Sequence, residues 1–113
     1  MESLQDTLRI AMGKKKMSIR KLEAAIVAEL GEEHKVSRNL IHEYLSGKRA
    51  PTYQAAIALS KALELSKKDF LLKTYFARQE QRKDTERERF IEFCRKEGIS
   101  IPERDITKQD NKG

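Results

Sequence analysis

The stretch from Val36 to Pro51 constrains the fold most, because it contains the start, the buried face and the end of one short helix. Ser37 can cap this helix, since its side-chain oxygen can accept from backbone N–H groups that lack partners in the first turn. Gly47 can adopt the left-handed conformation that ends a helix, and Pro51 prevents its continuation. The apolar residues between these signals recur at helical spacing: Ile41, Tyr44 and Leu45.

The opposite face of this helix carries hydrogen-bonding side chains: Arg38, Asn39, His42, Glu43 and Ser46. Two cationic residues, Lys48 and Arg49, follow the helix directly. A single charged residue on an exposed helix face is more often solvated surface than a ligand contact. Here the cap, the apolar face, the polar face and the basic loop occur together, which favours a helix that enters a DNA groove.

Apolar residues at helical spacing predict further helices before and after this stretch. The first covers Leu4 to Met12 and ends at Gly13, and the second ends at Gly31. Small polar residues are expected to cap the starts of the second, fourth and fifth helices: Ser18, Thr52 and Ser66. Because there is no long strand-like alternation and no internal repeat, the sequence predicts an all-α fold.

The chain changes character after Phe76. Residues 78–89 contain no apolar side chain, although their composition favours a helix and nothing in them breaks one. An apolar patch follows: Phe90, Ile91, Phe93 and Cys94. Such a patch needs a cover, which is either the body of the chain or a second subunit. From about Glu103 the residues are polar and predict a disordered tail.

Charge and cysteine content restrict the class of protein. The net charge of +6 suits a polyanionic partner, but the excess is shared equally between residues 1–66 and 67–113. Lys14, Lys15 and Lys16 are either a solvated turn or a phosphate contact. The single cysteine excludes an internal disulfide and fits a reducing compartment. Without a secretory signal or a membrane-spanning apolar run, we expect a cytoplasmic protein.

Four segments match a known domain in order: Ser18–Leu22, Val36–Tyr44, Ser46–Pro51 and Ile57–Leu63. From Leu4 to Leu65, a little over half its length, the chain resembles the Cro and phage-repressor helix-turn-helix family of the xenobiotic response element type. The resemblance implies a five-helix DNA-binding domain at residues 1–66. We expect a helical extension at residues 67–102, suited to dimerisation, and a disordered tail at 103–113.

In this family the third helix lies in the major groove with its N-terminal residues on base edges. The resemblance therefore implies base contacts by Arg38 and Asn39, followed on the same face by Glu43 and His42. Arginine suits guanine, asparagine suits adenine, and glutamate can accept from the cytosine amino group. The residues that the resemblance assigns to the DNA backbone are Ser18, Arg20, Ser37, Ser46, Lys48 and Arg49.

Two departures from the family pattern concern the second helix. The connection from Leu22 to Val36 is longer by roughly two helical turns, so that either the second helix is extended or the turn is enlarged. Ile19 stands where many family members have a glutamine that contacts a phosphate. Because isoleucine cannot make that contact, Ser18 or Arg20 is expected to replace it.

The resemblance implies a sequence-specific transcriptional regulator, a repressor of phage, plasmid or other mobile-element type. It would bind double-stranded DNA as a homodimer on a palindrome. The alternative is an antitoxin or bridging module whose C-terminal segment binds a partner protein. Enzymatic activity is not favoured, since the sequence has no metal-ligand cluster, no glycine-rich phosphate loop and no nucleophile beside a base. No cofactor is expected, and Cys94 reads as a small buried hydrophobe.

Overall fold

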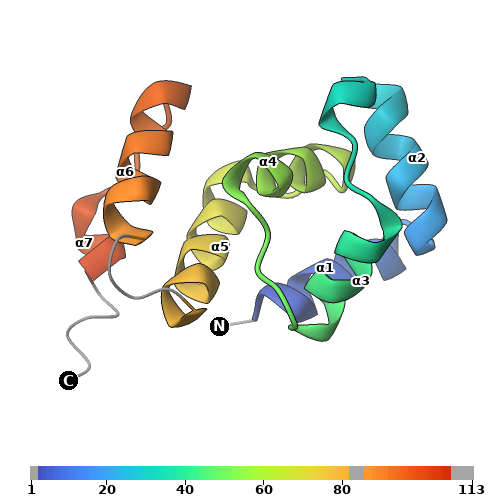
Figure 1. The fold of residues 1–113 in the computed structure, drawn as a ribbon, viewed down its shortest axis with the longest axis horizontal. Helices are drawn as coiled ribbons and strands as arrows, with labels where there is room; N and C mark the ends of the chain where they lie inside the picture. Colours follow the sequence, from blue (N-terminus) through green and yellow to red (C-terminus); the bar gives the residue numbers. More distant parts are fainter. Residues whose placement is uncertain (1–2, 82–85, 108–113) are drawn as a thin grey trace.

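The structure, a computed structural model, describes residues 3–81 and 86–107 (Figure 1). Throughout these residues the regular structure is helical and contains no strand, which confirms the predicted all-α class. None of the helices in this part of the chain is long and apolar enough to cross a membrane. In chain order the helices are α1 (Leu4–Lys14), α2 (Ile19–Leu30), the 3-10 helix η1 (Glu32–His34), α3 (Arg38–Ser46), α4 (Tyr53–Ala62), α5 (Lys67–Gln81), α6 (Glu86–Glu97) and α7 (Glu103–Thr107).

The predicted helix starts are confirmed by side-chain caps. In each case a hydroxyl oxygen accepts the backbone N–H of the residue three positions further on. The donor-to-acceptor distances are 3.2 Å for Ser18, 3.3 Å for Ser37, 3.1 Å for Thr52 and 3.3 Å for Ser66. These caps satisfy backbone donors that would otherwise lack partners, so the starts of α2 to α5 are fixed by local sequence.

The helix ends agree with the sequence at two of the three predicted glycines. Gly31 follows α2 with φ 102°, and Gly47 ends α3 in the left-handed region with φ 81° and ψ 4°. The prediction for Gly13 is wrong, because α1 continues through it to Lys14. The reversal occurs at Lys16, with φ 54°, where the N–H of Met17 bonds to the carbonyl of Met12.

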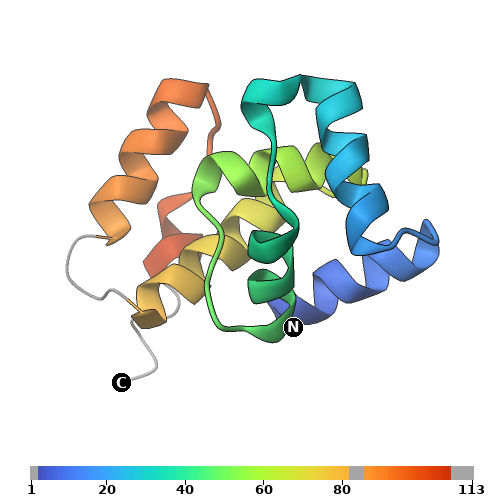
Figure 2. The same ribbon diagram turned by 45° about the vertical axis from the view of Figure 1, so that its right-hand side comes forward.

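The middle of the molecule is formed by α4 and α5. In Figures 1 and 2, α2 and α6 lie on opposite sides of this pair. α4 packs against α2 and α5, and α5 also packs against α1 and α6. The core is continuous across the predicted division after Ser66, and it includes the fully buried side chains of Leu8, Ile26, Ile41, Leu59, Tyr75 and Phe90.

The apolar patch of α6 is covered by the chain itself. The ring of Phe90 stacks on Tyr75 with centroids 4.7 Å apart, and Phe93 lies 5.4 Å from the ring of Tyr53. Cys94 is buried, as expected for a small hydrophobe, and burial raises the pKa of its thiol. The sequence left open whether the body of the chain or a second subunit covers this patch, and in the structure the body of the chain covers it. The patch therefore no longer provides a reason for dimerisation through residues 67–102.

The C-terminal residues differ from the predicted tail. Where disorder was expected from Glu103, the structure has the short helix α7, and Ile106 is only 4% exposed. One apolar side chain thus attaches this helix to the core. The part of the expected tail at 108–113 lies outside the described residues. The same holds for residues 82–85, within the stretch at 78–89 that was predicted as helix.

Candidate nucleic-acid interface

α3 is anchored by the apolar side that the sequence predicted. Ile41 is fully buried, Tyr44 is 2% exposed, and Val36 before the helix is also buried. This side packs against α1 and α2. Burial raises the pKa of the Tyr44 hydroxyl above its ordinary value. The packing leaves the opposite side of α3 facing outward.

Three of the four predicted base-contact residues lie together on that outward side. Arg38, Asn39 and His42 are exposed, whereas Glu43 is half-buried. The three exposed residues line an open groove of about 580 Å³ between α2 and α3, together with Ile19, Glu23 and Ser37. The groove combines guanidinium, amide, imidazole and hydroxyl groups, which are the side-chain groups that read base edges by hydrogen bonding.

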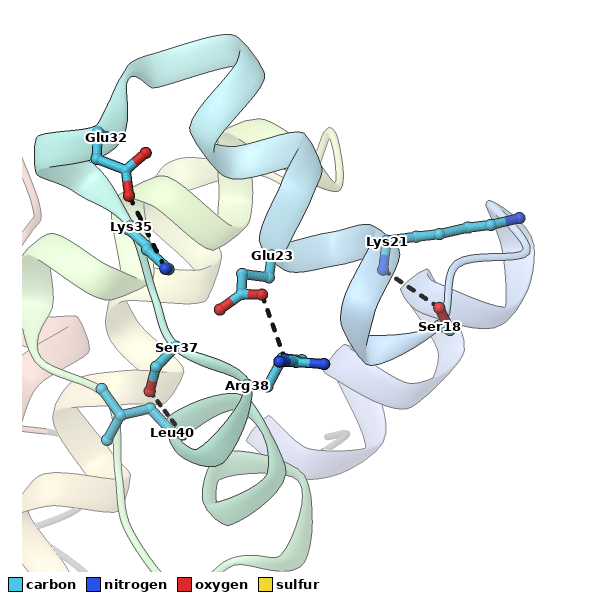
Figure 3. Close-up of polar contacts among 8 residues, drawn as sticks. All are labelled: Ser18, Lys21, Glu23, Glu32, Lys35, Ser37, Arg38 and Leu40. Atoms are coloured by element: carbon cyan, nitrogen blue, oxygen red, sulfur yellow. Dashed lines mark hydrogen bonds and ion pairs between the residues drawn. The ribbon is translucent and has the colours of Figure 1, made fainter.

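The extra length before α3 is divided between the second helix and the turn. α2 extends to Leu30, and η1 follows at Glu32–His34, so both of the alternatives contribute. Figure 3 shows the chain returning from η1 to α3 past Lys35, whose Nζ lies 3.8 Å from a carboxylate oxygen of Glu32. α2 and α3 pack against each other, and the groove lies between them.

Arg38 has a partner that the sequence reasoning missed. Its Nε lies 3.5 Å from Oε1 of Glu23, which projects from α2 toward the first residue of α3 (Figure 3). The Glu23 side chain is 18% exposed and that of Arg38 is 56% exposed. The contact depends on how α2 crosses α3. The local sequence shows only that Glu23 is a polar residue one helical turn after Ile19, which does not predict a contact with Arg38.

Glu43 is paired with a residue that was assigned to the DNA backbone. Its Oε1 lies 2.9 Å from Nε of Arg49, and the Arg49 side chain is 61% exposed. Exposed ion pairs contribute only about 0–1 kcal/mol, so this pair can open at little cost when DNA phosphates offer Arg49 another partner. In the free protein, however, Glu43 is set apart from the other three base-contact candidates.

The three serines predicted to contact the DNA backbone already form hydrogen bonds at the ends of helices. The hydroxyls of Ser18 and Ser37 accept the N–H groups of Lys21 and Leu40. A hydroxyl that accepts one hydrogen bond can still donate its proton, so both can bind a phosphate oxygen. The hydroxyl of Ser46 donates to the carbonyl of Glu43 at 3.1 Å.

The cationic candidates differ in their surroundings. Arg20 and Lys48 are exposed, and Lys48 lies in the loop that follows α3.

Of the three lysines near the end of α1, Lys14 is the last helical residue, and Nζ of Lys15 lies 2.9 Å from Oε2 of Glu64. This ion pair gives Lys15 a partner within the protein, but an exposed pair of this kind can open, so both the solvated turn and the phosphate contact stay predictions.

The loop after α3 is connected to α5 and α6 by polar contacts. Nη1 of Arg78 donates to the carbonyl of Pro51 at 3.1 Å, and its Nε donates to Oε2 of Glu86 at 2.8 Å. The hydroxyl of Tyr53 donates to the same carboxylate oxygen. The sequence reasoning missed this network, which holds the end of the basic loop against the core.

No group of three metal-ligating side chains occurs within residues 3–81 and 86–107. His42 belongs to the groove, whereas His34 is an exposed residue of η1.

Comparisons of the chain with protein-family models, with curated proteins and with solved structures found no match. Any proposal about function therefore rests on the geometry of this surface and on the sequence pattern of residues 18–63.

Proposed function

We propose that the protein is a sequence-specific DNA-binding transcriptional regulator, a repressor that inserts α3 into the major groove of its operator. The observation that supports this most is the exposure of Arg38, Asn39 and His42 together at the start of a helix whose other side is buried. An arginine and an asparagine can each form two hydrogen bonds with one base, to guanine and to adenine respectively. Two adjacent side chains thus suffice to select a short sequence.

The surrounding charges support contact with the DNA backbone. Lys48 and Arg49 follow α3 directly, and Arg20 is exposed on α2, which forms the other wall of the groove. Contacts of this kind supply affinity and fix the register of the protein on the duplex without reading sequence. The net charge of +6 favours the encounter with a polyanion.

The proposal includes a homodimer on a palindromic site. α3 has 9 residues and can read only a few base pairs. Two copies spaced by one helical turn of DNA, about 34 Å, would double the length of sequence read. Because the apolar patch of α6 is covered within the chain, the homodimer does not rest on that patch. A mobile-element origin and a cytoplasmic location are parts of the same proposal, taken from the resemblance and the single cysteine.

The antitoxin or bridging function receives less support. It relied on a charged C-terminal segment that is available to a partner protein. Within the described part of that segment, Arg78 and Glu86 contact each other and are buried or nearly so. These two residues serve the core of the chain itself and are not available to a partner, whereas Glu88 and Arg89 of the same segment are exposed.

The test is selection of bound duplexes from a random DNA pool by the purified full-length protein. We expect enrichment of an inverted repeat with half-sites about one helical turn apart. On the enriched duplex, Lys48→Ala should reduce the slope of log affinity against log salt by about 1. Lys96→Ala, at an exposed position of α6, is the matched control and should leave the slope unchanged. A pool that stays random after repeated selection would contradict the proposed function.

A further inference from the structure

We propose that Glu23 is a positioning residue that holds the guanidinium of Arg38 for an end-on contact with one guanine of the operator. This inference rests on the proposed function, because it concerns how the same surface selects its DNA. It adds a residue from α2 to the specificity of α3, and it names the base that this pair would select.

The position of the Glu23 carboxylate is set by α2 rather than by α3. Its side chain forms part of the groove wall and is only 18% exposed, whereas the side chain of Arg38 is 56% exposed. The 3.5 Å contact between Nε of Arg38 and Oε1 of Glu23 crosses from one helix to the other (Figure 3). A partly buried carboxylate thus restrains a long side chain that would otherwise sample many conformations.

The side of the guanidinium that Glu23 occupies decides which donors remain. A guanidinium has five N–H groups, one on Nε and four on the two terminal nitrogens. Because Glu23 faces Nε of Arg38, the terminal nitrogens are left for a ligand. In the major groove guanine presents two adjacent acceptors, N7 and O6, which match such a pair of donors. Adenine presents a donor beside N7, and cytosine presents a donor, so neither offers this pair.

The charge of Glu23 also opposes binding that does not depend on sequence. An unrestrained arginine can neutralise the nearest phosphate of any duplex, which adds affinity but no preference. The Glu23 carboxylate competes with phosphates for the guanidinium of Arg38, and it repels the DNA backbone itself. We therefore expect Glu23 to lower the affinity for random DNA while it raises the preference for guanine.

A purely structural role for the pair predicts a different outcome. Because Arg38 is more than half exposed, the ion pair should contribute little to folding, and Glu23 variants should remain folded. If Glu23 only supported the packing of α2 on α3, its replacement would weaken binding to every duplex alike. The preference for one base, rather than overall affinity, therefore distinguishes the two roles.

The experiment measures dissociation constants of the full-length protein on three duplexes. The first is the duplex selected by the wild type, and the second is a random duplex. The third is the selected duplex with adenine in place of one guanine, namely the guanine that the Arg38→Ala variant no longer prefers over other bases. The wild type should prefer guanine by about 5- to 150-fold. Glu23→Gln should remove most of this preference and bind the random duplex as tightly as the wild type or more tightly. Glu29→Gln, at an exposed position of the same helix, removes the same charge and should keep the preference.

The double variant Glu23→Gln/Arg38→Ala should show the same preference as Arg38→Ala alone, because the effect of Glu23 passes through Arg38. Glu23→Ala, with its fold checked by circular dichroism, should repeat the result. If Glu23→Gln retained the guanine preference, or weakened all three duplexes equally, the positioning role would be wrong while the proposed function stood. If the wild type itself did not distinguish the selected duplex from the random one, both the inference and the proposed function would fail.

Discussion

Arg78 and Glu86 form a nearly buried ion pair that joins the end of α5 to the start of α6. Nε of Arg78 lies 2.8 Å from Oε2 of Glu86, and the two side chains are 16% and 1% exposed. The hydroxyl of Tyr53 donates to the same oxygen, while Oε1 of Glu86 has no hydrogen-bond partner within the part of the chain that the structure describes. The Glu86 carboxylate thus connects the start of α6 to Arg78 of α5 and to Tyr53 of α4.

Replacement of Glu86 by alanine should lower the free energy of unfolding by about 3–5 kcal/mol, because the Arg78 side chain is only 16% exposed and its charge would lose its carboxylate partner. Glu86→Gln keeps the shape and one acceptor oxygen and should lose less. Urea denaturation measures both. Glu92→Ala, which removes an exposed partner of Arg95, is the control and should stay within about 0.5 kcal/mol of the wild type. Equal losses for Glu86→Ala and Glu92→Ala would contradict a stabilising role of the buried pair.

The stability of the fold should decrease at alkaline pH through Tyr53. Burial and the hydrogen bond to Glu86 raise the pKa of the Tyr53 hydroxyl in the folded protein. In the unfolded chain this hydroxyl titrates near its ordinary pKa of about 10. The free energy of unfolding should therefore be unaffected by this group below about pH 9 and should fall as the pH rises above about 10.

Denaturation midpoints at neutral and alkaline pH test this expectation. Tyr53→Phe lacks the titrating hydroxyl, so its stability should fall less steeply with pH than that of the wild type. Lysines and the other tyrosines titrate in both proteins and cancel in the comparison. Parallel pH profiles for the two proteins would show that Tyr53 does not carry the effect.

The parts of the fold that the sequence predicted are those with local causes. A serine or threonine cap needs only the three residues that follow it, so the starts at Ser18, Ser37 and Thr52 could be read directly. The same holds for the outward position of Arg38 and Asn39, which follows from helical periodicity. The fold class and the exposed face of α3 could therefore be predicted from the sequence.

The parts that were missed depend on residues distant in sequence. Glu86 lies in a polar run, and nothing local distinguishes a carboxylate that will be buried against Arg78 and Tyr53. Ile106 was assigned to the tail because one apolar side chain among polar ones gives no periodicity. The Glu23 contact required the packing of α2 on α3 to be known. Gly13 was misassigned since a glycine can also remain within a helix.

The left-handed backbone at Gly47 should make this position intolerant of a side chain. With φ 81° and ψ 4°, a non-glycine residue costs about 1–2 kcal/mol, and an added Cβ would lie 2.6 Å from Nε2 of Gln5. Gly47→Ala should therefore lower the melting temperature. Gly13→Ala is the matched control, because Gly13 is helical and has open space around it. That control should be neutral or stabilising by up to about 1 kcal/mol, and a destabilised Gly13→Ala would argue against the observed end of α1.

We propose that α3 reads DNA sequence through Arg38, and the affinity of Arg38→Ala for the selected duplex and for a random duplex tests this proposal. We predict a loss of about 1–3 kcal/mol on the selected duplex, a relaxed preference at one base pair, and a much smaller loss on random DNA. Equal losses on both duplexes would contradict base reading by Arg38, because Arg38 would then contact only phosphates.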